Sequence, residues 1–210
     1  MLQNGEGVSR DLSLAAEYYR RSAEQGNAAA QNNYGRMLES GTGVSRSLSL
    51  AAEYYRRSAD QGDEDGQYHY GRCLELGHGV AADAKLSAEY YRKSADAGHA
   101  EAQLSYGLCL AYGKGVGCDW SEAARYYKLS SDSGNSDGAL QYGLCLRHGR
   151  GVRSDSGESL GYLVLSSQRG NEFAEHIRLA AQLLDASVGP ESPTQAAFNP
   201  GLDDHKTPSK

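Results

Sequence analysis

The chain has 210 residues, 39% of them hydrophobic and 23% charged, and a formal net charge of −6 at pH 7. This composition is typical of a globular protein, and the net negative charge, without a cluster of lysine and arginine, excludes binding to the backbone of nucleic acid. We expect no membrane insertion, because no apolar run approaches the roughly 18–20 residues of a membrane helix and no signal-peptide pattern opens the chain.

A period of 36 residues runs through the chain. A Tyr-Gly pair opens at Tyr34, Tyr70, Tyr106 and Tyr142, and a Gly-x-Gly-Val stretch opens at Gly5, Gly41, Gly77, Gly113 and Gly149. A fixed period of roughly 20–50 residues is the signature of a solenoid, in which each unit buries its apolar face against its neighbours. The sequence therefore predicts a stack of similar units.

The chain begins inside a unit, so residues 1–26 are expected to form a truncated first repeat, mainly its second helix at about 12–25. Met1 occupies the repeat position of Met37, two-thirds of the way through a first helix. This phase predicts a fragment of a longer protein, or a gene model begun at an internal methionine.

Four full units are predicted at about 27–62, 63–98, 99–134 and 135–170, each with two short helices. Apolar residues of the first unit recur at helical spacing, at Ala30, Tyr34, Met37 and Leu38 and again at Leu48, Ala51, Ala52, Tyr55 and Ala59. Asn27 and Ser47 are N-cap residues, and Gly41 ends the first helix because glycine readily adopts left-handed φ values.

Three recurring columns are expected to serve packing. Gly35 and its equivalents stand inside the first helix, where glycine costs about 0.5–1 kcal/mol relative to alanine. We interpret them as the point where the two helix backbones approach each other. Thirteen of the 15 tyrosines fall in three columns and are expected to fill the core. Serine recurs at Ser22, Ser58, Ser94, Ser130 and Ser166, where we expect that alanine would also fit.

The end of the chain departs from the period. Residues 172–186 occupy the place of another first helix, but Arg178-Leu179 replaces Tyr-Gly, so an atypical capping helix is predicted. Residues 187–210 contain all four prolines and are predicted to form a disordered tail.

No cofactor, metal ion or catalytic site is expected. Cys73, Cys109 and Cys145 share the column of Met37, which indicates soft core packing, and only Cys118 lies outside it. The chain has no CxxC, and its histidines, His69 among them, are interpreted as neutral surface residues. Free thiols suggest a reducing, cytoplasmic location.

These residues carry a family resemblance over about residues 1–186. The frame from Gln31 through Tyr34-Gly35 to Leu38 is similar to the W-x₂-L-G-x₂-Y stretch of tetratricopeptide repeats, and Ala15-x₃-Tyr19 is similar to their A-x₃-F. The unit length, the Gly-x-Gly-Val loop and the Tyr-Tyr pair resemble the Sel-one-like branch of that superfamily. The resemblance implies an all-α, right-handed solenoid of antiparallel helix-turn-helix repeats, a tetratricopeptide-like superhelix.

The resemblance also places a concave groove on the first helices, at offsets −3, +1 and +4 from the recurring glycine. These positions are Asn32, Arg36, Glu39, Tyr68, Arg72, Glu75, Leu104, Leu108, Ala111, Leu140, Leu144 and Arg147. Arg36 and Arg72 are expected to hold acidic groups, and the leucines to dock apolar side chains of a peptide. The alternative is that the tail, the final helix or tight curvature covers those leucines.

The sequence thus predicts a non-catalytic scaffold or adaptor that binds a protein or peptide in this groove. Two alternatives stay open. One is the repeat arm of a larger signalling enzyme whose catalytic domain lies outside this chain. The other is a hydrolase of cell-wall or lactam substrates, an activity that the resemblance associates with paired cysteines in each unit, which this chain lacks.

Overall fold

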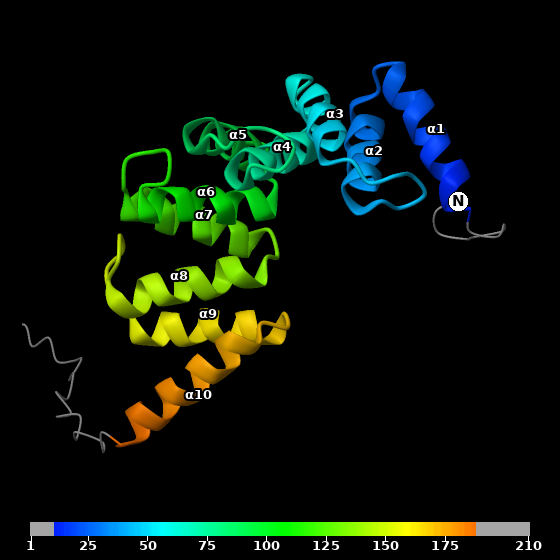
Figure 1. Cartoon of the computed structure of the whole chain (residues 1–210). Coiled ribbons are helices and arrows are strands. Elements are labelled where there is room, and N and C mark those ends of the chain that lie inside the picture. Colours follow the sequence, from blue (N-terminus) through cyan, green and yellow to red (C-terminus); the bar gives the residue numbers. More distant parts are fainter. Residues whose placement is uncertain (1–10, 188–210) are drawn as a thin grey trace, which may run out of the picture.

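The computed structural model describes residues 11–187, with side chains described as far as residue 179. Over these residues the chain forms ten α-helices and no strand. The helices are α1 (Leu12–Glu24), α2 (Ala28–Ser40), α3 (Leu48–Asp60), α4 (Glu64–Leu76), α5 (Ala84–Asp96), α6 (Ala100–Tyr112), α7 (Trp120–Asp132), α8 (Ser136–His148), α9 (Ser156–Gln168) and α10 (Glu172–Ser187). Figure 1 shows them stacked in chain order, from α1 at one end to α10 at the other. The predicted all-α repeat solenoid is confirmed.

Short-range chemistry sets the ends of the helices. The side chain of Asn27 accepts a hydrogen bond from the Ala30 amide, and α2 ends at Gly41, whose φ is +75°. His99, which is not a common cap residue, has the same role, because its Nδ1 accepts from the Ala102 amide at 3.2 Å. Such caps satisfy amides that have no partner within the helix.

The first and second helices of the repeats lie on different sides of the solenoid. Each helix packs on the next along the chain, and the first helices of neighbouring repeats also contact each other, α2 with α4 and α6 with α8. No pair of second helices within residues 11–187 contacts as extensively. The first helices therefore form the inner side of the curve, and the second helices form the outer side.

In the first three full repeats, the glycine inside the first helix makes room for an aromatic ring, whereas the carbonyl oxygen of Ser159 is among the nearest atoms at Gly143, 3.3 Å from a Cβ. A Cβ at Gly107 would lie 2.7 Å from Cε1 of Tyr127 on α7, and a Cβ at Gly35 would lie 2.7 Å from Cε1 of Tyr55. Atoms of the facing backbone are farther away, since the Ala123 oxygen lies 3.4 Å from the same point at Gly107. The facing helix does approach too closely for a Cβ, as expected, but at Gly35, Gly71 and Gly107 the atoms that fill the space belong to its tyrosine ring and not to its backbone.

The serine column also differs from its prediction. The hydroxyl of Ser130 donates to the carbonyl oxygen of Ala100 at 2.8 Å, and Ser58 donates to Ala28 at 2.9 Å. Ser94 and Ser166 make the equivalent bonds. Each bond joins a second helix to the start of its first helix, and alanine would remove this interhelix bond. The serines are hydrogen-bonding residues and not fillers.

The core is a continuous stack of small and aromatic side chains. Its largest fully buried members include Tyr55, Tyr91, Tyr127 and Leu163, one from each full repeat. No helix in the described part of the chain is long and apolar enough to cross a membrane. The first ten residues of the predicted truncated repeat, and residues 188–210 of the predicted tail, lie outside the described residues.

Candidate functional site

The inner side of the solenoid presents most, but not all, of the predicted groove residues. Arg36 and Glu75 are exposed, and Glu39, Tyr68, Arg72, Leu104, Leu108, Leu144 and Arg147 are half-buried. Asn32 and Leu140 are only 3% and 8% exposed. Ala111 is buried as well. The prediction that Asn32 and Leu140 line an open groove is therefore wrong, because neighbouring helices cover them.

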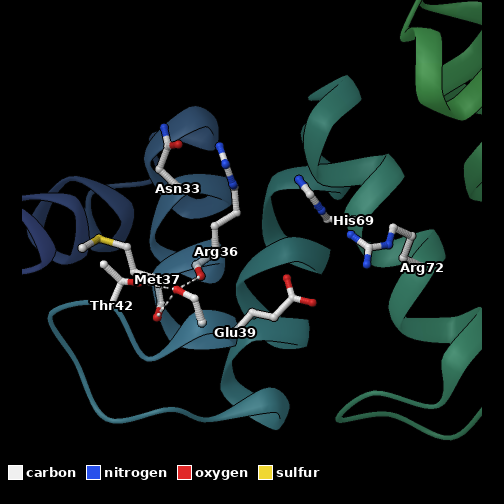
Figure 2. A pocket seen from close by; sticks show the side chains of 8 residues that line it. Asn33, Arg36, Met37, Glu39, Thr42, His69 and Arg72 are labelled. Atoms are coloured by element: carbon white, nitrogen blue, oxygen red, sulfur yellow. Dashed lines mark hydrogen bonds between the residues drawn. The ribbon is translucent and has the colours of Figure 1, made fainter. Parts of the chain in front are cut away.

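An open pocket of about 440 Å³ lies between α2 and α4. It is lined by Asn33, Arg36, Met37, Glu39, Ser40, Thr42, His69 and Arg72. Figure 2 shows the side chains of Arg36, Glu39, His69 and Arg72 gathered around the same opening. The structure thus brings together three of the predicted groove residues, Arg36, Glu39 and Arg72, in one pocket, which we call the arginine pocket.

The arginine pocket has an excess of positive charge. Neither Arg36 nor Arg72 forms an ion pair with any residue that the structure describes. The Cζ of Arg72 lies 5.9 Å from the ring centroid of Tyr68, a weak cation–π contact. Glu39 is already bound, because the hydroxyl of Tyr55 donates to its Oε2 at 2.7 Å. Two guanidinium groups therefore face solvent beside one hydrogen-bonded carboxylate.

His69 is the pocket residue that sequence reasoning misjudged. It is half-buried and stacks on Tyr55, with ring centroids 4.9 Å apart and an interplanar angle of 19°. Burial above all, and then the charge of Arg72, lowers its pKa to about 4, so the imidazole is neutral at pH 7. Its buried Nδ1 has no hydrogen-bond partner among the described residues. In the sequence, only its position two residues before Gly71 on the first helix indicated that His69 could lie near the groove.

Tyr68 and Glu75 extend the inner face beyond the pocket. The Tyr68 ring stacks on His99 with a centroid distance of 4.6 Å, which couples α4 to the start of α6. Glu75 accepts a hydrogen bond of 2.7 Å from the hydroxyl of Tyr91, as Glu39 does from Tyr55. These bonds hold both carboxylates against the solenoid, while the guanidinium groups of Arg36 and Arg72 form no ion pair with a described residue.

The apolar end of the predicted groove is largely covered. Leu104 and Leu108 pack against the core of the middle repeats. Leu140 and Leu144 belong to a cluster with Leu163 of α9 and with Ala174 and Ile177 of α10. The final helix thus covers part of this leucine surface, which was the alternative left open by the sequence.

The cysteines of the shared column show no sign of reactivity. Burial is the main cause that raises the pKa of the Cys73, Cys109 and Cys145 thiols to about 11, so they are protonated at neutral pH. Within residues 11–179, no group of three or more His, Cys, Asp or Glu side chains is arranged to hold a metal ion.

The fold and this lined inner face define a helical-repeat solenoid. A family model described as the Sel1 repeat matches residues 1–27, 28–63, 64–99, 100–135 and 136–171. The chain belongs to the Sel1 repeat family. Repeats of this family generally mediate protein–protein interactions.

Solved structures agree with this assignment. A Sel1 repeat protein from Oxalobacter formigenes is 30% identical, with a TM-score of 0.78, and the match covers 83% of this chain and 71% of that chain. The protective antigen c5321 of uropathogenic Escherichia coli is 31% identical, with a TM-score of 0.81, over 91% of this chain and 41% of that chain. This chain therefore spans well under half of c5321. Cysteine rich protein B of Helicobacter pylori, 23% identical with a TM-score of 0.50 over 62% of this chain and 93% of that chain, shares the fold alone. No curated protein matches the chain by sequence.

Proposed function

We propose that this chain is a non-catalytic interaction module that binds an acidic segment of a partner protein on its inner face. The observation that carries the proposal is the arginine pocket, where Arg36 and Arg72 come from neighbouring repeats and have no ion-pair partner among the side chains of residues 11–179. Membership of the Sel1 repeat family supports it, because these repeats generally bind proteins.

The chemistry of the pocket favours a carboxylate. A guanidinium group offers paired donors that match the two oxygens of a carboxylate, and such charge-assisted bonds are stronger than neutral ones. A hydrogen bond to a charged group contributes about 1.5–3 kcal/mol, less where solvent screens the charge. Glu39 does not compete strongly for the arginines, because the Tyr55 hydroxyl holds its carboxylate. We infer that an extended segment with two acidic residues would engage both arginines.

The test measures the affinity for a fluorescein-labelled hexaglutamate peptide by fluorescence anisotropy. The double variant Arg36→Gln/Arg72→Gln is expected to weaken binding at least tenfold, with a smaller dependence on salt. Arg153→Gln/Lys85→Gln removes two exposed cations, one from the loop before α9 and one from α5, and serves as the charge-matched control. Hexaglutamine is the matched neutral peptide. Equal affinity of the two variants, or equal binding of the two peptides, would refute the proposal.

A further inference from the structure

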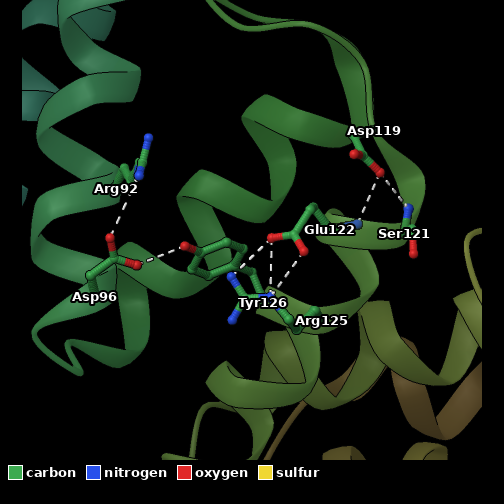
Figure 3. Close-up of polar contacts among 7 residues, drawn as sticks. All are labelled: Arg92, Asp96, Asp119, Ser121, Glu122, Arg125 and Tyr126. Carbon is green, nitrogen blue, oxygen red and sulfur yellow. Dashed lines mark hydrogen bonds and ion pairs between the residues drawn. The ribbon is translucent and has the colours of Figure 1, made fainter.

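The outer side of the third full repeat contains an arginine held by a ring and a carboxylate. Cζ of Arg125 lies 4.2 Å from the ring centroid of Tyr126. Its Nε and Nη2 donate to Oε2 of Glu122 at 3.0 and 2.9 Å. The Tyr126 hydroxyl in turn donates to Asp96 at 2.7 Å. Figure 3 shows this arrangement on α7. The guanidinium group of Arg125 lies over the Tyr126 ring, and the Glu122 carboxylate accepts hydrogen bonds from the edge of that guanidinium group.

The fourth repeat keeps the ring and the carboxylate of this arrangement but not the arginine. Glu158 and Tyr162 stand 36 residues after Glu122 and Tyr126, and Gly161 stands at the position of Arg125. The ring of Tyr162 is placed as in the third repeat: its centroid lies 4.7 Å from that of Tyr142 at an interplanar angle of 85°. The equivalent pair, Tyr106 and Tyr126, has values of 4.8 Å and 88°.

The first and second full repeats also supply a cation to this tyrosine column. Arg57 lies 5.2 Å from the Tyr54 centroid, and Lys93 lies 4.9 Å from the Tyr90 centroid. Both cations stand three residues after the tyrosine, where the fourth repeat has Leu165. No cation lies over the ring of Tyr162 among the residues described here.

The space beside Tyr162 is an open pocket of about 430 Å³ on the outer side of the solenoid. It is lined by Ser131, Asp132, Glu158, Gly161, Tyr162, Leu165 and Arg169. A side chain at Gly161 would meet no atom within 4 Å of its Cβ. The buried hydroxyl of Ser131 has no hydrogen-bond partner within the described part of the chain.

The charges around this pocket leave one carboxylate without a partner. Asp132 is paired with Lys128 at 3.1 Å. Arg169 is held by the carbonyl oxygen of Ser131, to which its Nη1 donates at 2.8 Å. Glu158 forms no ion pair with any described residue. Arg169 lines the pocket and Lys128 interacts with the Tyr162 hydroxyl, so both positive charges oppose a second cation at close range. Binding therefore depends on the face of the Tyr162 ring and on the unpaired carboxylate of Glu158.

We infer that this pocket receives the guanidinium group of an arginine side chain from a partner protein. The group stacks on Tyr162 and binds Glu158, as Arg125 does with Tyr126 and Glu122 in the preceding repeat. A cation–π contact and a charge-assisted, two-point hydrogen bond favour guanidinium over ammonium at such a site. The site lies on the second helices and is separate from the arginine pocket of the inner face.

The test follows the Gly161 amide and the Tyr162 ring by NMR during titration with the tripeptide acetyl-Gly-Arg-Gly-amide. We expect saturable shifts of both signals, at least fivefold weaker binding of the citrulline and lysine tripeptides, and severalfold weaker binding by Glu158→Gln. The variant Gly161→Arg places a guanidinium on the chain itself and is expected to abolish binding, whereas the matched control Gly161→Ala keeps it.

Either of two results would overturn the inference. One is equal affinity for the arginine and citrulline tripeptides or for the arginine and lysine tripeptides. The other is equal binding by Gly161→Arg and Gly161→Ala. The variant Arg36→Gln/Arg72→Gln is expected to bind the tripeptide as the unmodified chain does, so this test is independent of the inner-face proposal.

Discussion

Alanine substitution of three helical glycines is expected to give three different effects on stability. Gly107, Gly143 and Gly161 all lie inside helices, so each gains the same intrinsic helix preference of about 0.5–1 kcal/mol. The space around their Cβ positions differs. The nearest atom lies 2.7 Å away at Gly107 and 3.3 Å away at Gly143, and no atom lies within 4 Å at Gly161.

The magnitudes follow from these distances. The ring that meets the new methyl group at Gly107 belongs to Tyr127, which is 1% exposed and cannot move into solvent. Overpacking of this kind costs about 1–3 kcal/mol. Gly107→Ala is therefore expected to destabilise the protein by about 1–2 kcal/mol. Gly143→Ala should be nearly neutral, and Gly161→Ala should stabilise by about 0.5–1 kcal/mol.

Urea unfolding followed by circular dichroism measures the series. Because repeat proteins can unfold unit by unit, hydrogen exchange of α6 and α9 should accompany it, so that each change is assigned to its own repeat. A Gly107→Ala variant at least as stable as Gly161→Ala would refute the reasoning. The contact with the Tyr127 ring would then have no effect on stability beyond the helix preference that both sites share.

Three further predictions concern other groups. Ser130→Ala should lower the free energy of unfolding by about 1 kcal/mol, because the buried hydrogen bond from α7 to the Ala100 carbonyl of α6 is lost; an unchanged urea midpoint would contradict this. His69 has a pKa of about 4 in the fold against 6.5 ordinarily, so the unfolded chain binds its proton first as the pH falls. Stability is expected to decrease between pH 6.5 and pH 4 by up to ~1.4 kcal/mol per unit, and His69→Gln should flatten that slope in urea titrations; an unchanged slope would contradict the burial of the imidazole. At pH 8, a disulfide reagent should label one thiol quickly, that of exposed Cys118, and the three buried thiols only on unfolding; more than one fast thiol would contradict the burial.

The helical frame could be predicted from the sequence because its determinants are local. Ala30, Tyr34 and Met37 recur at helical spacing, Asn27 caps the helix that they form, and Gly41 ends it in a left-handed conformation. The apolar spacing, the N-cap and the terminating glycine each act within a turn or two of helix. Because the same residues return every 36 positions, the same helix pair is predicted in every repeat. An all-α solenoid follows from these features without any knowledge of the tertiary contacts.

The candidate sites could be predicted from the sequence only in part. Arg36 and Arg72 were predicted to face the same groove, and the structure places them in one pocket. Leu140 was assigned to the same groove by its offset from glycine, yet Leu163 and Ala174 cover it. The offset fixes only the helix face of a residue. The neighbours that cover that face belong to other helices, and here to the atypical α10.

The sequence by itself determined the period, the helix pairs and the positions where one repeat differs from the next, because these depend on residues close together along the chain. Only the tertiary structure decided what those differences mean. Gly161 can be read from the sequence as a glycine in the column of Arg125. That Arg125 stacks on Tyr126, and that the equivalent place beside Tyr162 is an open pocket, depends on how side chains from α7 and α9 meet in space.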